Sequence, residues 1–106
     1  MPERSFMELA IEEAYVGVKA GQGGPFGAAV VKGEMVLAAA HNSVISDNDP
    51  TRHAEIKAIS LAARKLGTYD LTGCEIYTTT EPCPMCFSAI HWARITRLVY
   101  GTRIET

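Results

Sequence analysis

The chain has 106 residues, an apolar fraction of 47%, a charged fraction of 21% and a formal net charge of −2. This length allows one domain with a single core, and the composition is ordinary for a soluble globular protein. The small net charge argues against a large nucleic-acid footprint. No apolar run approaches the roughly 18 residues that a membrane span needs, and residues 1–4 lack the basic and apolar regions of a signal peptide.

The N-terminal stretch predicts a helix that ends in a glycine-rich loop. Ser5 and Glu8 have the spacing of a capping box, in which the serine caps the helix and the glutamate reaches back to its start. Apolar residues follow at helical spacing, so a helix is expected from about Phe6 to Ala20. Residues 21–25 then form a flexible loop rather than a phosphate cradle, because no strand precedes the glycines and no Gly-Lys-Ser/Thr follows them.

Two short apolar runs, residues 26–31 and 35–40, predict a β-hairpin with its turn at Gly33. Their unbroken apolar character predicts strands that are covered on both faces. A polar loop follows over residues 41–50. Asn42, at the start of this loop, could hydrogen-bond a ligand or simply organise its own turn.

The second half of the chain alternates helix and strand. Asp49 offers an N-cap and Pro50 a first helical residue, so a helix with a wide apolar surface is expected from about Thr51 to Leu66. The remaining elements are a strand over residues 75–80, a helix from Cys83 to about Ala93 and a strand over residues 97–101. A helical crossover joins these two strands, so they should be parallel. The fold class is therefore α/β, a three-layer α/β/α sandwich with a mixed sheet.

A histidine, a glutamate and two cysteines stand near two of these helix starts. The sequence reads His-Ala-Glu at residues 53–55 and Glu-Pro-Cys-Pro-Met-Cys at residues 81–86. A catalytic zinc site uses three nitrogen or sulfur ligands from the protein and keeps a fourth position for water. His53, Cys83 and Cys86 supply three such ligands. Glu55 lies about 200° around the helix from His53, which suits a group that passes on a proton better than a fourth ligand.

The combination of H-x-E with P-C-x-x-C is typical of zinc-dependent nucleobase deaminases, in which the glutamate is the general acid and base. The alternatives for the C-x-x-C pair are a closed structural zinc site and a thioredoxin-like redox pair, and the redox pair leaves His53 and Glu55 without a role. With two of the three cysteines assigned to metal, Cys74 stays unpaired. This argues against a disulfide framework and predicts a reducing, cytoplasmic location.

On these residues the chain resembles the cytidine deaminase superfamily, and within it most closely the bacterial guanine deaminases. The resemblance extends from the first helix to Gly101 and is carried by residues 23–28, Asn42, residues 48–55, residues 81–86 and residues 92–94. It implies a cytidine deaminase-like fold and the hydrolytic deamination of a free purine base, guanine to xanthine and ammonia. Deaminases of tRNA adenosine are similar at residues 49–55 and 81–83, so a tRNA adenosine deaminase or another nucleoside or nucleotide deaminase is the alternative.

The resemblance also implies roles for individual residues. His53, Cys83 and Cys86 would hold Zn²⁺ and Glu55 would transfer the proton. Three further residues would contact the base: Phe26 would pack on it, Asn42 would hydrogen-bond to it, and the backbone N–H of Ala54 would read a polar edge. The implied partners are a small purine base and a second copy of the chain in a homodimer, rather than nucleic acid or a membrane.

Guanine deaminases continue beyond this length with C-terminal segments that close the active site. Residues 1–106 are therefore expected to form a single zinc-dependent deaminase domain without the C-terminal extension of that family. A third hypothesis, from a different class, is a catalytically inactive scaffold domain stabilised by a metal. It predicts a fourth protein ligand, for which Cys74 and His41 are the spare residues.

Overall fold

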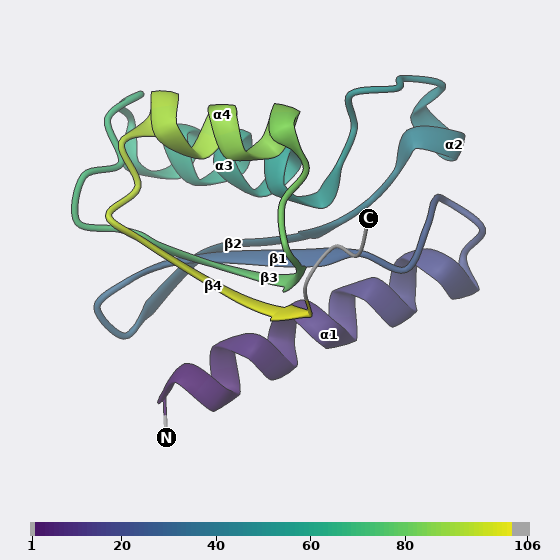
Figure 1. Cartoon of the computed structure of the whole chain (residues 1–106), viewed down its shortest axis with the longest axis horizontal. Coiled ribbons are helices and arrows are strands. Elements are labelled where there is room, and N and C mark those ends of the chain that lie inside the picture. Colours follow the sequence, from purple (N-terminus) through teal and green to yellow (C-terminus); the bar gives the residue numbers. More distant parts are fainter. Residues whose placement is uncertain (1, 103–106) are drawn as a thin grey trace.

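The computed structural model describes residues 2–102, which form a four-stranded mixed sheet between two layers of helices (Figure 1). The elements in chain order are α1 (Pro2–Lys19), β1 (Gly27–Lys32), β2 (Met35–His41), α2 (Val44–Asp47), α3 (Ala54–Leu66), β3 (Glu75–Thr80), α4 (Pro84–Ala93) and β4 (Arg97–Thr102). The sheet order is β2-β1-β3-β4; β1 is antiparallel to both of its neighbours, and β3 and β4 are parallel. The predicted three-layer α/β/α fold with a mixed sheet is confirmed.

The core lies on both faces of the sheet, and its larger cluster is on the side of α3 and α4. Helix α1 covers one face, where the Phe6 ring lies against Tyr77 with 5.4 Å between the ring centroids. Helices α3 and α4 cover the other face. Three fully buried alanines, four residues apart, line the side of α3 that packs on the sheet: Ala54, Ala58 and Ala62. Side chains this small let the helix lie close to the strands, which holds its N-terminus in a fixed place.

The first helix begins earlier than the sequence predicts. The expected N-cap, Ser5, lies inside α1, which already begins at Pro2. Proline fits a first helical position because it has no backbone N–H to leave unpaired. The predicted partner of Ser5, Glu8, instead forms an ion pair with Arg4 at 3.5 Å, one turn along the helix. The capping-box prediction is therefore wrong.

Helix α3, which follows the first predicted metal ligand, starts later than predicted. The Asp49 side chain accepts hydrogen bonds from the backbone N–H and the hydroxyl of Thr51, at 2.8 and 2.7 Å, and so closes a turn of its own. His53, with extended backbone angles, is the N-cap of α3. The loop before it contains the short helix α2, which the sequence analysis does not predict. Strand β3 has its predicted bounds, β2 and β4 each extend one residue further, and β1 is shifted by one residue toward the C-terminus.

Among the described residues, no helix has the length and apolar character that crossing a bilayer requires.

Candidate metal centre

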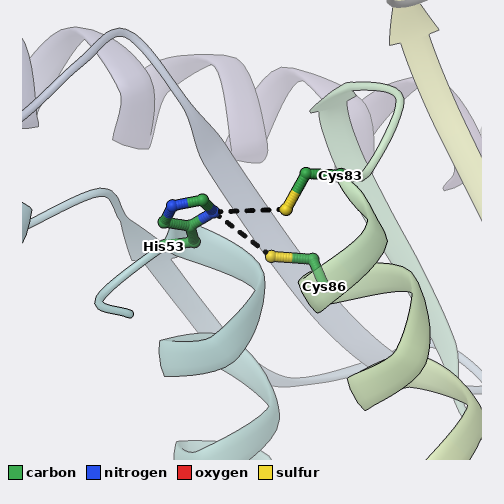
Figure 2. Close-up of side chains that lie close together, drawn as sticks. All are labelled: His53, Cys83 and Cys86. Atoms are coloured by element: carbon green, nitrogen blue, oxygen red, sulfur yellow. Dashed lines mark hydrogen bonds between the residues drawn. The ribbon is translucent and has the colours of Figure 1, made fainter. Parts of the chain in front are cut away.

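Two helix starts bring the predicted metal ligands together. His53 is the N-cap of α3, Cys83 is the N-cap of α4, and Cys86 lies in the first turn of α4. Pro84 occupies the first helical position of α4, where a missing N–H costs little. Figure 2 shows the three side chains pointing toward one another from the ends of the two helices.

The distances fit a zinc ion. The Nδ1 atom of His53 lies 3.6 Å from Sγ of Cys83 and 3.5 Å from Sγ of Cys86. Zn–N bonds of about 2.0–2.1 Å and Zn–S bonds of about 2.3 Å, set at a tetrahedral angle, place nitrogen and sulfur about 3.6 Å apart. The three ligand atoms all lie within 4.8 Å of one another. One imidazole and two thiols in this geometry are a donor set for zinc, with room for a fourth ligand.

Without a metal, the environment of the Cys86 thiol opposes its ionisation. Burial raises the pKa of the Cys86 thiol well above its ordinary value, and the negative charges of Glu55 and Cys83 raise it further. A zinc ion held by these residues would favour the thiolate, because coordination by a cation deprotonates a thiol.

The carboxyl group of Glu55 lies next to the three metal ligands but is not one of them. Glu55 is the second residue of α3 and is 9% exposed. Burial raises the pKa of its carboxyl group, while its own backbone N–H and the neighbouring His53 and Cys86 lower it. The metal-ligand group contains His53, Cys83 and Cys86 but not Glu55. The structure thus holds one buried carboxyl close to three metal ligands without adding it to them.

A pocket of about 200 Å³ opens beside the three ligands. It is lined by Phe26, Asn42, His53, Glu55, Thr80, Glu81 and Cys83. Its volume is below the roughly 300–1,000 Å³ of pockets for drug-sized ligands, so it suits one small ring system. Phe26 is 40% exposed, which leaves part of its ring free to contact a ligand. Ala54 is fully buried and does not line the pocket, so the contact of its N–H with a base stays a prediction.

The amide of Asn42 has a defined orientation. Its Oδ1 atom accepts a hydrogen bond from the backbone N–H of Val44 at 3.0 Å, while its own backbone N–H donates to the carbonyl of Phe26 at 3.1 Å. Because an N–H donor must face the amide oxygen, the NH₂ group is the part of the side chain that stays available. At 7% exposure in the pocket wall, Asn42 can offer a hydrogen-bond donor to a ligand.

Two further residues line the pocket: Glu81, which belongs to the motif at residues 81–86, and Thr80, which the sequence analysis does not name as a site residue. Both lie where β3 leaves the sheet, just before Cys83. The carboxyl end of this strand, where ligands bind in α/β sheets, is the signal that places Glu81 near the site, and the same signal applies to Thr80.

The scaffold hypothesis requires a fourth protein ligand, and the described residues do not supply one. Within residues 2–102, neither Cys74 nor His41 joins the metal-ligand group. Cys74 is buried beside the start of β3, and His41 is hydrogen-bonded to Glu13 and Gln22.

A mixed sheet with two helix starts that converge on one histidine and two cysteines defines a zinc-binding domain of the deaminase type. The model of the cytidine and deoxycytidylate deaminase zinc-binding region matches residues 2–102. The chain therefore belongs to the cytidine and deoxycytidylate deaminase family, and zinc is the cofactor of that family's metal site.

Three relatives illustrate the similarity. Guanine deaminase of Bacillus subtilis is 48% identical over 101 residues, which are 95% of this chain and 65% of that protein. The tRNA-specific adenosine deaminase of Aquifex aeolicus is 42% identical over 101 residues, or 95% of this chain and 66% of that protein. The X-ray structure of the Bacillus subtilis guanine deaminase superposes with a TM-score of 0.94 at 47% identity and covers 97% of this chain and 66% of that one. The chain thus spans about two thirds of the length of these relatives.

Proposed function

We propose that this chain carries the active centre of a hydrolytic deaminase that acts on a free purine base, converting guanine and water to xanthine and ammonia. The observation that carries the proposal is the open pocket shared by the metal-ligand group, the Glu55 carboxyl and the donor side of Asn42. The 48% identity with a guanine deaminase supports guanine as the base.

Glu55 would move the protons of this reaction. The C2–N bond to the exocyclic amine breaks and a C2–O bond to water forms, so a proton must travel from the water to the ring and to the departing amine. Zinc, when bound by His53, Cys83 and Cys86, supplies Lewis-acid activation of a water molecule. The buried carboxylate of Glu55 would take one proton of that water and pass it to a ring nitrogen; it would then take the second proton from the new C2 hydroxyl and give it to the amino group, which leaves as ammonia.

Phe26 and Asn42 would hold the base. The exposed part of the Phe26 ring offers an apolar face for a planar heterocycle, and the NH₂ group of Asn42 offers a donor to an oxygen or ring-nitrogen acceptor. A base with such an acceptor on its edge is oriented by this pair. A ligand without one leaves the Asn42 amide unpaired, which costs binding free energy.

An assay of ammonia release tests the proposal. Zinc-loaded protein is incubated with guanine, adenine, cytosine and their nucleosides, alongside the Glu55→Ala variant. We expect ammonia and xanthine from guanine with the unaltered protein, and neither with the variant. Ammonia from none of these small compounds would refute the proposal.

A specific observation supports a second candidate, the deamination of adenosine in tRNA. A shallow groove of about 100 Å³ on the α3 side is lined by Arg52, Lys57, Ser60, Leu61 and Arg64. Arg52 is close to Asp47 and Asp49, at 3.8 and 3.4 Å, which reduces its contribution to the positive potential. Conversion of adenosine to inosine in an anticodon stem-loop, weakened by Lys57→Ala with Arg64→Ala and by added salt, would favour this candidate over the first.

The homodimer and the cytoplasmic location stay predictions. Helix α4 exposes aromatic side chains, with Trp92 85% exposed and the Phe87 ring stacked on His91 at 6.0 Å between centroids. Sedimentation equilibrium of the unaltered protein and of Trp92→Ser measures whether two copies associate and whether α4 contributes to the contact.

A further inference from the structure

His41 makes two side-chain contacts on the face of the sheet opposite to the pocket. Its Nδ1–H donates to the Glu13 carboxylate at 2.8 Å, and its Nε2 is in hydrogen-bond contact with the side-chain amide of Gln22. Both His41 and Glu13 are largely buried, with side-chain exposures of 15% and 26%. A partly buried contact with a carboxylate is among the stronger hydrogen bonds in proteins, so this one ties the end of β2 to α1.

The missing side chain of Gly17 leaves space for the imidazole ring of His41. A Cβ atom at Gly17 would lie 2.6 Å from Cδ2 of His41, so the ring rests directly on the backbone of α1. Glu13 stands one turn before Gly17 on the same side of the helix. Helix α1 thus supplies the backbone surface on which the His41 ring packs and the Glu13 carboxylate that accepts its hydrogen bond.

Gln22 connects the His41 contact to helix α2. Its backbone carbonyl accepts hydrogen bonds from the N–H groups of Ile45 and Ser46, at 3.0 and 3.1 Å, and so holds the first turn of α2. The next residue, Gly23, lies so close to Asn42 that a side chain there would overlap the Asn42 amide. The loop that His41 holds is therefore in direct contact with Asn42.

Successive residues of a strand point to opposite faces of the sheet, and this relates the His41 contact to the pocket. His41 ends β2 and points toward α1, while the next residue, Asn42, lines the pocket on the other face. A shift of the Gln22–Gly23 loop would remove both the wall behind Asn42 and the support of α2. The orientation of Asn42 depends on that support, because its Oδ1 accepts the N–H of Val44, the first residue of α2.

We propose that Glu13 and His41 are positioning residues, which hold the Gln22–Gly23 loop and α2 so that the NH₂ group of Asn42 faces the pocket before a base binds. The proposal rests on the proposed function for its effect on catalysis. The structural part, the ordering of the loop and of α2, stands independently of the substrate.

The test compares Glu13→Leu, which removes the acceptor of His41, with Glu13→Gln, which keeps an oxygen acceptor at that place. Glu12→Leu is the matched control, since Glu12 is the exposed neighbour on the same helix. Amide hydrogen exchange is measured by NMR in zinc-loaded protein. In Glu13→Leu we expect the exchange of Ile45 and Ser46 to accelerate by about tenfold, with the amides of Val30 and Ile76 in the central strands unchanged. Glu13→Gln and Glu12→Leu should exchange as the unaltered protein does.

Kinetics provide the second measurement. With guanine, Glu13→Leu should raise KM by about tenfold and change kcat by less than about twofold, because the preset Asn42 contributes to binding of the base. Unchanged exchange at Ile45 and Ser46, or equal acceleration there and at Val30 and Ile76, would overturn the proposal. If guanine is not turned over at all, the proposed function fails, and the exchange measurement still decides the positioning role.

Discussion

The Nδ1 atom of His53 lies 3.5 Å from Sγ of Cys86, although 33 positions separate the two residues in the chain. This closeness predicts that metal and fold stabilise each other. At a free zinc concentration about a thousandfold above Kd, binding adds roughly 4 kcal/mol to the free energy of unfolding, or about 15–30 °C in Tm for a domain of this size. A chelator should remove that increment from the unaltered protein, as measured by calorimetry.

The variants His53→Ala and Cys86→Ala should start without the increment and show no response to the chelator. Cys74→Ala is the matched control, because Cys74 is equally buried but lies outside the metal-ligand group. It should lose some stability from the cavity and keep the full response to the chelator. A chelator response in Cys86→Ala equal to that of the unaltered protein would contradict the assigned ligand set.

The second prediction separates metal binding from proton transfer. Glu55→Gln keeps the size of the side chain and removes its ability to accept a proton. The variant should bind one zinc per chain, measured by atomic absorption, and should lose about 10²–10⁴-fold in kcat, the usual contribution of a general acid and base. Glu34→Gln, in the exposed hairpin turn, should retain full activity. A zinc-free Glu55→Gln protein would show that the carboxylate is a metal ligand.

The third prediction concerns the contact between α1 and the sheet. Gly27 lies so close to Ala10 that a Cβ atom at position 27 would overlap the carbonyl oxygen of that residue. Backbone atoms cannot move aside as a side-chain end can, so Gly27→Ala should lower the free energy of unfolding by about 1–3 kcal/mol or more. Gly33→Asn, in the open hairpin turn at φ 62°, should cost less because asparagine tolerates the left-handed region. Urea unfolding curves measure both, and an equal cost would show that α1 can shift.

The fourth prediction concerns the alanines beneath α3. Ala58 is fully buried between the helix and the sheet, so Ala58→Leu should cost about 1–3 kcal/mol by overpacking. It should also weaken zinc binding, because the displaced helix carries His53 at its start. Leu61→Ala, at a largely exposed position of the same helix, should do neither. Zinc affinity by competition with a chromogenic chelator and Tm by calorimetry measure the two effects.

Much of the fold could be predicted because its signals are local. Glycines follow two of the helices near the place where the apolar pattern stops, Gly21 after α1 and Gly67 after α3, both with positive φ. The convergence of His53, Cys83 and Cys86 could be predicted because residue type and motif spacing indicate zinc chemistry without knowledge of the fold. The parallel pairing of β3 and β4 follows from the helix that connects them.

The parts that could not be predicted depend on contacts that are distant in sequence. Asp49 looks like a helix cap, but the chain after it is held by a contact with a residue before α2, in which the backbone N–H of Ser43 donates to the carbonyl of Arg52 at 3.0 Å. Helix α2 forms where the carbonyl of Gln22 accepts hydrogen bonds from the N–H groups of Ile45 and Ser46. The contact of His41 with Glu13 joins residues 28 positions apart. The periodic pattern of apolar residues carries no information about any of these contacts.

The two helix starts that carry the candidate ligands belong to separate strand–helix units, so an ion held between them acts as a cross-link between distant parts of the chain. Closing a segment of 30 positions restricts the unfolded chain and also opposes partial opening, in which α3 and α4 separate while the sheet persists. The supply of zinc would then govern how often this end of the molecule opens. Proteases that cleave transiently opened states would remove metal-free chains sooner than loaded ones.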